Sequence, residues 1–430
     1  MPFEPPSYNA RESAERPFAS IQDFNAMTRL VIVGGGHAAS QLAASLAEKR
    51  FPGQVALISD EVHLPYHRPP LSKTLIKDPE AVLPELRGAA FYEQAGIELR
   101  LGTRVQGIDR ARKVLRLVAP DGPRELAYDH LVLATGAKAR ELPQAPVGTP
   151  GVHYLRTYDQ AQALRDALAQ ARRIVVLGGG FIGLEIAATA RQLGKEVTVF
   201  EAMPRLLARS VSPAVSDFLL ATHRGAGVGI RLGTMVDGLQ MAQGRATGVL
   251  AGGLSVPADV IIAGIGATPN VDLARDAGLA CDDGIVVDAT LATTDPDISA
   301  IGDCVAFPHP DWPQRLRLES VQNANDQAKA LAARLCGEPQ PYAAVPWFWS
   351  DQGEARLQIT GLWRPGCESV LRPASRGNGF SVLHYEGTRL RAIESVNSPV
   401  DHMAARRLMQ SGQSPDKAVV GDPARPIQAA

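Results

Sequence analysis

The sequence predicts an α/β protein with two Rossmann-like dinucleotide-binding domains, followed by a C-terminal α+β domain. Two segments support the prediction, because each reads as an apolar strand, a glycine-rich turn, a helix of small residues and a second apolar strand. Their glycine turns occupy residues 34–39 and 178–183. The chain after about Val345 differs from both, since it holds three of the four tryptophans and alternates apolar with polar positions.

Length and composition agree with a multidomain globular enzyme. A chain of 430 residues exceeds one ordinary core, and 45% hydrophobic with 21% charged residues is close to the globular average. The formal net charge of -1 argues against a nucleic-acid-binding protein, which normally carries a basic excess. The chain also has no apolar run of about 18 residues, so no membrane contact is expected.

The chain opens with a segment that we expect to lie outside the folded domains. Residues 1–27 carry prolines and charges but lack the apolar centre of a signal peptide. We therefore predict a disordered N-terminal extension over residues 1–27.

The first repeated unit begins with a strand at residues 30–33 and a helix that runs to Lys49. A second strand follows at residues 55–58 and ends at Asp60 and Glu61. The second unit has a strand at 174–177, a helix at 184–193 and a strand at 197–200 that ends at Glu201. Each unit is typical of a right-handed crossover between neighbouring parallel strands.

The glycine turns are suited to binding a pyrophosphate. In the first turn, Gly34 allows the tight bend, Gly36 leaves room for the phosphates and Ala39 lets helix and strand pack closely. The phosphates then accept hydrogen bonds from free N–H groups at the positive end of the helix. The second turn repeats these roles with Gly178, Gly180 and Gly183. Two turns in one chain predict two bound nucleotides.

The acidic residue after each second strand indicates which nucleotide binds. A carboxylate at Glu201 would bind the 2′-hydroxyl of NAD and repel the 2′-phosphate of NADP, so we favour NADH. Arg205 lies close enough in sequence to offer an alternative phosphate ligand. In the first unit Asp60 and Glu61 are adjacent, and both remain candidates for the ribose.

The remaining segments divide the chain into domains. A strand-rich piece closes at residues 128–136, apolar strands recur at 260–270 and 298–303, and a helix is expected at 323–335. We expect residues 28–145 and 272–344 to form one split nucleotide domain and residues 146–271 to form a second, inserted one. Residues 345–430 would form the third domain, with a tail of loop or ordered coil from Asp416.

Five motifs resemble the NADH:ferredoxin reductases of oxygenase systems, a family of putidaredoxin reductase-like enzymes that includes biphenyl dioxygenase reductases and rubredoxin reductase. The most specific are Arg-Leu-Glu-Ser-Val-Gln-Asn-Ala at residues 317–324 and Val-Pro-Trp-Phe-Trp-Ser-Asp-Gln at 345–352. Pro-Tyr-His-Arg-Pro-Pro-Leu-Ser-Lys at 65–73 and the segments 178–188 and 298–303 match as well. The resemblance runs from about Arg29 to the C-terminus and implies a glutathione-reductase-like fold that binds FAD and NADH.

The resemblance also implies roles for individual residues. Lys73 and Glu185 look like an ion pair beside the flavin N5, where hydride arrives, and they are the predicted catalytic residues. Other flavin contacts would come from Arg68, from Thr135 and Gly136 after the central strand, and from Asp303, Val321 and Trp349. Glu185 and Gly266 would also contribute to the NAD site. The helix after Glu319 would direct its positive end at the flavin.

The tryptophans and cysteines bear on how electrons leave. Trp347 and Trp349 are consistent with ordinary packing, with a place at the flavin edge, or with both. The four cysteines are far apart, which favours separate thiols in a reducing cytoplasm over a metal cluster or a disulfide framework. Flavin disulfide reductases carry a redox cysteine pair near the Ser-Lys end of the flavin loop, but this chain has no cysteine before Cys281. Reduced flavin would therefore deliver its electrons directly.

The implied activity is transfer of a hydride from NADH to FAD and then of single electrons to a [2Fe–2S] ferredoxin. Such encounters are transient and electrostatic, so we expect a basic patch among Arg315, Arg317, Lys329 and Arg334, on a monomer or weak homodimer. Two alternatives stay open from the sequence. One is a rubredoxin reductase, and the other is a flavin-bound redox sensor or scaffold that resembles apoptosis-inducing factor.

Overall fold

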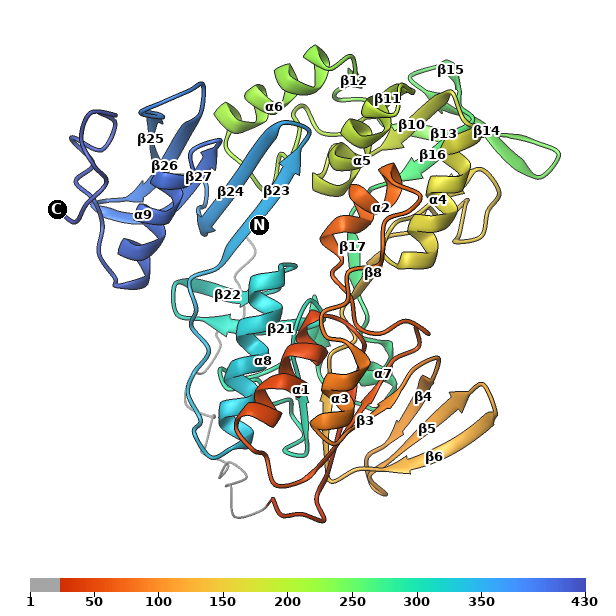
Figure 1. The fold of residues 1–430 in the computed structure, drawn as a ribbon. Coiled ribbons are helices and arrows are strands. Elements are labelled where there is room, and N and C mark those ends of the chain that lie inside the picture. Colours follow the sequence, from red (N-terminus) through yellow and green to blue (C-terminus); the bar gives the residue numbers. More distant parts are fainter. Residues whose placement is uncertain (1–23) are drawn as a thin grey trace, which may run out of the picture.

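The computed structural model describes residues 24–430, whose elements gather in three bodies (Figure 1). Most of the predicted N-terminal extension, residues 1–23, lies outside the described residues. The prediction of disorder is wrong for Phe24, which is 9% exposed and packs its ring 5.3 Å from Phe51 and 6.0 Å from His130. Burial of an aromatic ring against the first sheet compensates the entropy cost of ordering this residue.

The first body is built on a five-stranded parallel sheet. Its apolar central strand is fully covered, because Leu30, Val31 and Ile32 are each 0% exposed. Helices α1 (His37–Glu48) and α8 (Val321–Leu335) pack side by side against this sheet. The strand order is β20 (Ile298–Ala300), β7 (His130–Leu133), β1 (Arg29–Val33), β2 (Gln54–Ile58), β3 (Ile97–Arg100). The strand before Thr135 is therefore β7, next to the central strand and not the central strand that the sequence predicted.

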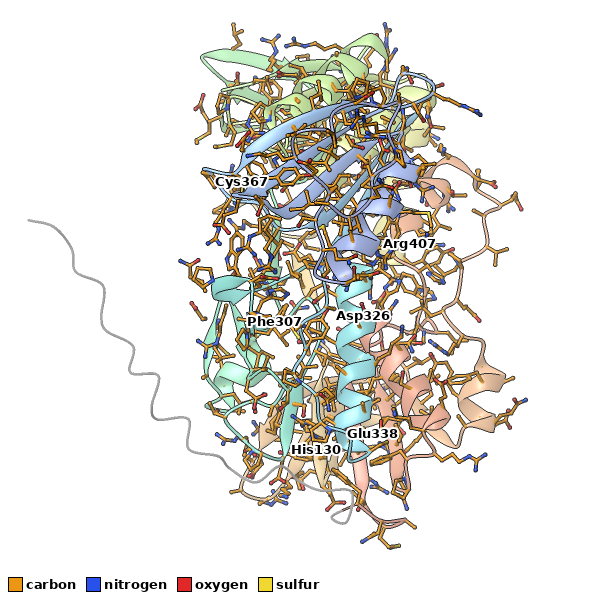
Figure 2. All side chains as sticks on the ribbon, turned by 90° about the vertical axis from the view of Figure 1, so that its left-hand side faces the viewer. His130, Phe307, Asp326, Glu338, Cys367 and Arg407 are labelled. Carbon is orange, nitrogen blue, oxygen red and sulfur yellow. The ribbon has the colours of Figure 1, made fainter. Side chains whose placement is uncertain are left out.

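Smaller elements surround this sheet. Figure 2 shows α8 along one face, with Asp326 in its upper part, below Arg407 of the third body, and Glu338 just beyond its lower end. An antiparallel three-stranded sheet holds β4 (Arg104–Asp109), β5 (Val114–Ala119) and β6 (Gly122–Ala127). A four-stranded sheet holds β18 (Cys281–Asp282), β19 (Gly284–Val286), β21 (Val305–His309) and β22 (Trp312–Leu316). Short helical segments are η2 (Pro69–Ser72), α2 (Thr74–Lys77), α3 (Ala89–Gln94) and α7 (Asp272–Asp276).

The second body repeats the plan of the first. Its parallel sheet has the order β12 (Gly229–Arg231), β11 (Glu196–Phe200), β10 (Arg173–Leu177), β16 (Val260–Ala263), β9 (Val152–His153). Three helices accompany it, namely α4 (Tyr158–Gln170), α5 (Phe181–Gln192) and α6 (Pro213–Gly225). An antiparallel sheet of β13 (Val236–Ala242), β14 (Arg245–Ala251) and β15 (Leu254–Pro257) lies beside it.

Two antiparallel segments connect the first and second bodies. These are β8 (Ala137–Ala139) and β17 (Ala267–Pro269), which pair with each other where the chain leaves and re-enters the first body. The pairing holds the two connections in register. The two glycine turns thus belong to separate sheets that share a short two-stranded link.

The third body is an antiparallel sheet with one helix, as expected for an α+β domain. Its strand order is β23 (Trp347–Gln352), β24 (Ala355–Gly361), β27 (Arg389–Val396), β26 (Phe380–Glu386), β25 (Glu368–Pro373), and its helix is α9 (Pro399–Gln410). Arg372 donates hydrogen bonds to the carbonyls of Val420, Asp422 and Arg425. These bonds hold the C-terminal tail in place, although the tail forms no helix or strand. None of the helices among residues 24–430 has both the length and the apolar character that crossing a bilayer requires.

Candidate functional site

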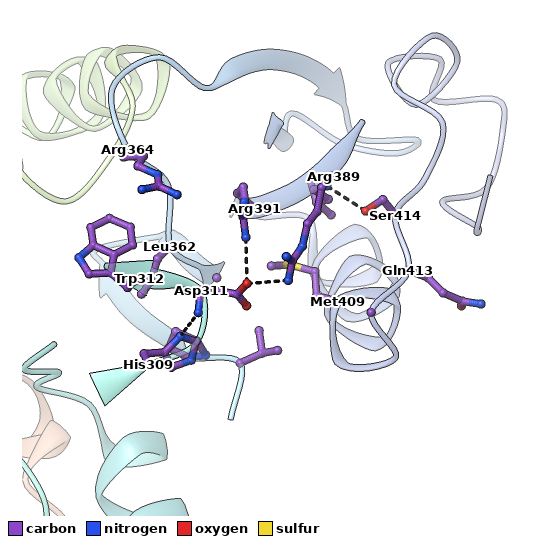
Figure 3. A pocket seen from close by; sticks show the side chains of 15 residues that line it. His309, Asp311, Trp312, Leu362, Arg364, Arg389, Arg391, Met409, Gln413 and Ser414 are labelled. Carbon is purple, nitrogen blue, oxygen red and sulfur yellow. Dashed lines mark hydrogen bonds and ion pairs between the residues drawn. The ribbon is translucent and has the colours of Figure 1, made fainter. Parts of the chain in front are cut away.

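A pocket that holds about 1110 Å³ of space lies where the three bodies meet. Its walls come from the first glycine turn, the loop around η2, the start of α5, the start of α8 and strand β23. A second hollow of about 560 Å³ lies between β22 and the third body (Figure 3). There Asp311 accepts from Arg389 at 2.7 Å and from Arg391 at 2.9 Å, so this hollow is a charged contact between domains.

The first glycine turn leaves open space at the position that faces the pocket. Gly34 has φ of +130°, and a Cβ there would lie 2.2 Å from the carbonyl oxygen of Ala134. Gly36 is different, because its φ of -94° and ψ of -170° suit any residue. Apart from Gly36 and its two chain neighbours, no described protein atom lies within 4 Å of the Cβ position at Gly36. Neither backbone strain nor protein packing therefore requires a glycine there, and the space fits a pyrophosphate at the N-terminus of α1.

The second turn shows the same division of labour. Gly178 has φ of +100°, and its Cβ would lie 2.3 Å from the carbonyl oxygen of Gly264. A Cβ at Gly183 would lie 2.3 Å from the carbonyl oxygen of Gly178, so this glycine permits close packing of α5. At Gly180 a Cβ would lie 3.9 Å from the carbonyl oxygen of Gly264, the nearest described atom apart from its chain neighbours, so packing does not require a glycine there either. Ala39 takes the place of Gly183 in the first turn and is 0% exposed.

Glu201 is tied to the second turn by its own backbone. Its carboxylate accepts from the N–H of Gly179 at 2.6 Å and from the N–H of Met203 at 2.7 Å. These bonds hold the acid at the end of β11 beside the glycine turn, as the prediction of a ribose contact requires. Arg205 instead donates to the carbonyls of Ala208 and Val211 at 2.6 and 2.7 Å, which uses its guanidinium for loop structure.

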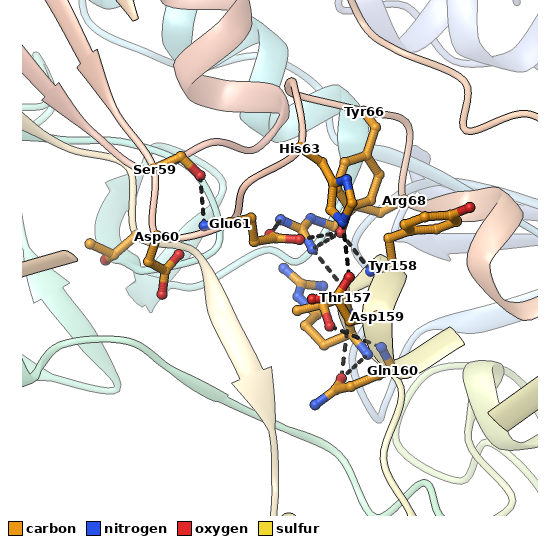
Figure 4. Close-up of polar contacts among 12 residues, drawn as sticks. Ser59, Asp60, Glu61, His63, Tyr66, Arg68, Thr157, Tyr158, Asp159 and Gln160 are labelled. Atoms are coloured by element: carbon orange, nitrogen blue, oxygen red, sulfur yellow. Dashed lines mark hydrogen bonds and ion pairs between the residues drawn. The ribbon is translucent and has the colours of Figure 1, made fainter. Parts of the chain in front are cut away.

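The two candidate acids of the first unit occupy different environments (Figure 4). Asp60 is exposed and lies 3.6 Å from Arg104. Glu61 instead forms an ion pair with Arg68 at 2.6 Å and accepts from the hydroxyl of Tyr66 at 2.5 Å. Burial raises the pKa of Tyr66, which keeps this hydroxyl protonated as a donor. Glu61 therefore fixes the position of the pocket-lining Arg68.

The predicted catalytic pair faces the pocket. Lys73 Nζ lies 2.7 Å from Glu185 Oε2, and the side chains are 20% and 5% exposed. Two serines also donate to this carboxylate, Ser72 at 2.6 Å and Ser350 at 2.6 Å. Lys73 comes from the loop beside η2, Glu185 from α5 and Ser350 from β23, so one carboxylate connects all three bodies.

Of the other predicted flavin contacts, some line the pocket and some do not. Gly136, Asp303, Val321 and Trp349 line the pocket together with Arg68 and Lys73. Thr135 does not, because its hydroxyl donates to the carbonyl of Asn270 at 2.7 Å and so links the two connecting segments. Gly266 also lies outside the pocket walls, and its carbonyl accepts from the N–H of Arg140 at 2.9 Å.

The two tryptophans combine both readings of their sequence motif. Trp349 lines the pocket, and its ring stacks on Trp347 with centroids 5.6 Å apart. The guanidinium of Arg406 lies 4.4 Å from the centroid of the Trp347 ring. Packing and contact with the pocket therefore coexist on the same strand.

Sequence reasoning missed several pocket residues, among them His37, Arg156 and Phe181. Arg156 donates to Asp303 at 2.8 Å, but nothing around a lone arginine before α4 indicated this partner. Burial and the nearby His67, Arg68 and Arg156 lower the pKa of His37 to about 3, so its ring is neutral at physiological pH. Its position directly after the glycines of the first turn was a usable signal.

The predicted basic patch is wrong for two of its members. Arg334 is 7% exposed and donates to the carbonyl of Thr290 and to the hydroxyl of Ser299. The side chain of Arg317 is 13% exposed and pairs with Asp283 and Glu319. Only exposed charges reach a docking partner, so Lys329, with a side chain 61% exposed, and Arg315 remain from that prediction.

Comparisons with known proteins identify the family. Residues 28–328 match the pyridine nucleotide-disulphide oxidoreductase family, and residues 347–430 match the reductase C-terminal family. Rhodocoxin reductase of Rhodococcus erythropolis is 46% identical over 88% of this chain and 89% of its own. Putidaredoxin reductase of Pseudomonas putida is 40% identical over 94% of this chain and 97% of its own.

Solved structures agree with these matches. The ferredoxin reductase for the CYP199A2 system from Rhodopseudomonas palustris has a TM-score of 0.87 and 42% identity, covering 92% of this chain and 98% of its own. The covalent putidaredoxin reductase–putidaredoxin complex has a TM-score of 0.88 and 40% identity, covering 94% and 98%. The predicted fold class is confirmed. The chain therefore belongs to the pyridine nucleotide-disulphide oxidoreductase family, as an enzyme that uses FAD and NAD(H).

Proposed function

We propose that this enzyme passes electrons from NADH through FAD to a [2Fe–2S] ferredoxin that serves an oxygenase such as a cytochrome P450. The observation that carries the proposal is the Lys73–Glu185 ion pair, which faces a pocket shared by both nucleotide-binding bodies. Relatives support the acceptor, because their names include a ferredoxin–NAD(+) reductase component of an anthranilate dioxygenase system. One similar structure is a reductase joined covalently to putidaredoxin.

The proposed site divides between the two bodies. Residues 28–145 and 272–344 would bind FAD, residues 146–271 NADH, and residues 345–430 would close the pocket. Gly36 and the N-terminus of α1 would hold the FAD pyrophosphate, Asp303 a sugar-type hydroxyl, and Val321 the flavin end beside α8. Gly180 and Glu201 would hold NADH. Bound FAD supplies the chemistry of accepting a hydride and releasing electrons one at a time.

The cysteines support direct delivery of electrons. Cys281, Cys304, Cys336 and Cys367 all lie among the described residues and are free. Cys304 follows Asp303 of the pocket, but it is 0% exposed and burial raises the pKa of its thiol. A protonated, enclosed thiol is a poor nucleophile and a poor redox relay. Unpaired thiols also support the proposed cytoplasmic location.

We place the ferredoxin near the stacked tryptophans. Trp349 reaches from the pocket wall to Trp347, over which Arg406 lies. Lys329 of α8 adds an exposed positive charge on an element that packs against β23. Positive charge near the stacked tryptophans, where electrons would leave, favours an acidic partner and a short-lived, electrostatically guided encounter. We further propose that the enzyme is a monomer or weak homodimer, which light scattering tests across concentrations.

The proposal is tested with the purified, FAD-loaded enzyme. NADH oxidation is measured with a [2Fe–2S] ferredoxin and cytochrome c as terminal acceptor, and in parallel with rubredoxin. Ferredoxin-dependent reduction of cytochrome c that exceeds the rubredoxin rate supports the proposal. A faster rubredoxin reaction would assign the enzyme to that acceptor instead. Slow turnover with both, together with a large conformational change on reduction, would indicate a sensor or scaffold.

A further inference from the structure

The carboxylate of Glu185 receives hydrogen bonds on both of its oxygens. Oε2 accepts from Ser72 Oγ at 2.6 Å and pairs with Lys73 Nζ at 2.7 Å. Oε1 accepts from Ser350 Oγ at 2.6 Å. The first two donors come from the loop of the first body, whereas Ser350 comes from the C-terminal sheet. The hydroxyl of Ser350, from the third body, therefore supplies the hydrogen bond to Oε1 of this carboxylate.

Ser350 is itself held by a chain of donors. Gln352 Nε2 donates to Ser350 Oγ at 2.7 Å and to the carbonyl of Phe181 at 3.3 Å. A carbonyl only accepts, so the Phe181 bond fixes which end of the Gln352 amide is the nitrogen. The amide oxygen then faces His223 Nε2 at 3.0 Å, and that ring nitrogen must be the donor. Burial lowers the pKa of His223, which keeps the imidazole neutral.

The hydrogen bonds that link these side chains therefore all run in one direction, from His223 toward Glu185. His223 donates to Gln352, Gln352 donates to Ser350, and Ser350 donates to Glu185. Because Ser350 accepts from Gln352, its own hydrogen is free to be given to the carboxylate. Donors that are aligned in this way polarise one another and strengthen the hydrogen bond that Ser350 donates to the carboxylate.

The strand geometry explains why these two residues act together. Ser350 and Gln352 are two positions apart on β23, so both side chains lie on the same face of the sheet. They are 1% and 0% exposed, whereas Asp351 between them is partly exposed. Strand β23 also packs against α5, which carries Glu185. The inward face of one short strand thus presents the hydroxyl to the carboxylate.

We propose that Ser350 and Gln352 are positioning residues that orient the Lys73–Glu185 pair for hydride transfer. The inference rests on the proposed function, because it assumes that the pair acts where NADH meets the flavin. Ser350 holds Glu185 Oε1, and Gln352 acts through Ser350. Without Ser350 a buried carboxylate oxygen loses its donor, and the carboxyl group turns toward other partners. The position of Lys73 then becomes less defined.

The test compares Ser350→Ala with Ser395→Ala in FAD-loaded protein. Ser395 is a matched control, because it is a buried serine of the same sheet whose hydroxyl bonds Ser381 at 2.9 Å, outside the Glu185 chain. We expect Ser350→Ala to slow flavin reduction by NADH about tenfold in stopped-flow measurements, with the Kd for NADH unchanged. Ser395→Ala should react at the wild-type rate. Ser350→Thr, which keeps the hydroxyl, should recover most of the rate.

A crystal structure of the Ser350→Ala variant gives a readout that does not depend on activity. We expect Glu185 to adopt a second rotamer or to lie more than 4 Å from Lys73 Nζ. Gln352→Leu tests the chain separately, including the case in which Ser350→Ala fails to fold. Its effect should not add to that of Ser350→Ala in the double variant, because Gln352 works through that hydroxyl.

The possible outcomes separate this inference from the proposed function. If wild-type flavin is not reduced by NADH, the proposed function fails. The positioning role is overturned if the wild type reacts but Ser350→Ala matches Ser395→Ala with the ion pair unmoved. A double variant whose effects simply add would remove Gln352 from the chain.

Discussion

The two glycine turns share a backbone conformation but lie in different surroundings. In both, the first glycine has positive φ and lies against a carbonyl at the end of the neighbouring strand. At the glycine two positions later, Gly36 or Gly180, a Cβ would meet no described atom closer than 3.9 Å apart from its chain neighbours. The residue that begins the helix is His37 in the first turn and Phe181 in the second. Ala39 packs α1 where the second turn needs Gly183. Bending and ligand space are thus common to both turns, whereas their surroundings have diverged.

The charges around the two turns differ more than the turns themselves. Near the first, Arg68 pairs with Glu61 and Arg156 pairs with Asp303, at 2.6 and 2.8 Å. Near the second, Glu201 accepts hydrogen bonds from the backbone N–H groups of Gly179 and Met203. Ion pairs therefore hold the side chains around the first turn, whereas backbone donors hold the acid at the second. The predictions below test that contrast.

The largest expected effect comes from filling the two ligand spaces. Gly36→Val should yield folded protein that loses FAD, with affinity at least 100-fold lower, because its side chain occupies the pyrophosphate space. Gly180→Val should retain FAD and lose NADH by a similar factor. Absorbance of bound flavin and NADH titration measure the two affinities. Normal binding of either nucleotide to the corresponding variant would contradict the proposed sites.

The matched controls are the first glycines of each turn. Gly34→Ala and Gly178→Ala place a Cβ at 2.2 and 2.3 Å from a backbone oxygen. These variants should lose stability as well as binding, since the backbone itself must move. Thermal unfolding of the FAD-free proteins distinguishes them from the valine variants.

The next effect concerns the ion pair between Lys73 of the first body and Glu185 of the second. Lys73→Met leaves Glu185 buried without its cation, which should lower the free energy of unfolding by about 3 kcal/mol. Flavin reduction by NADH should slow about 100-fold, because the fixed positive charge beside the pocket is lost. The double variant Lys73→Met/Glu185→Leu should regain much of the stability and none of the rate.

Lys77→Met is the control for this pair, since Lys77 lies on the next helical segment and its Nζ donates to Gln192 at 3.2 Å, away from Glu185. Its stability and rate should match those of the wild type. An equal loss in both lysine variants would mean that general positive charge, and not the Lys73–Glu185 contact, sets the rate.

A smaller effect is a pH-dependent stability that we expect from the first parallel sheet and not from the second. His130 of β7 pairs in register with Leu30, and the equivalent position of β16 is Val260, paired with Ile174. Burial, Arg334 and Lys113 lower the pKa of His130 to about 3, from an ordinary value of 6.5. The unfolded chain therefore takes up a proton below pH 6.5 that the folded protein refuses. The free energy of unfolding is therefore unaffected by the protonation of His130 above pH 6.5, and it falls by about 1.4 kcal/mol per pH unit between pH 6.5 and pH 3.

His130→Val makes the first sheet resemble the second and tests this linkage. At pH 7.5 the variant should be about 1 kcal/mol less stable, because Ser299 loses a hydrogen-bond partner at 2.8 Å. At pH 5.5 the wild type has lost this advantage, so the two unfolding free energies should converge. Urea unfolding at both pH values measures the gap. A gap that stays constant would show that His130 does not titrate between the folded and unfolded states.

The same contrast shows what sequence alone could predict. Gly34 and Gly36 were assigned from the spacing of a local turn, whose geometry depends on a few neighbouring residues. Lys73, Glu185 and Trp349 were placed by resemblance, and the structure brings them to one pocket. Arg156 could not be found, because its partner Asp303 lies far along the chain. Arg334 was misplaced for a similar reason, since only the packed structure shows that its guanidinium is taken up by Thr290 and Ser299.

The last expected effect concerns the choice of nicotinamide nucleotide at the second turn. Glu201→Gln keeps an amide oxygen that can accept from Gly179 or Met203, so the turn should remain folded. It removes the negative charge that repels a 2′-phosphate, and the preference for NADH over NADPH should fall about tenfold, or about 1.4 kcal/mol. The ratio of kcat/KM values for the two nucleotides measures this. Glu196→Gln at the start of the same strand, where Glu196 pairs with Arg172, should leave the ratio unchanged. A wild-type enzyme that uses NADPH as well as NADH would show that the Glu201 charge does not discriminate, and the second site would then lose its main difference from the first.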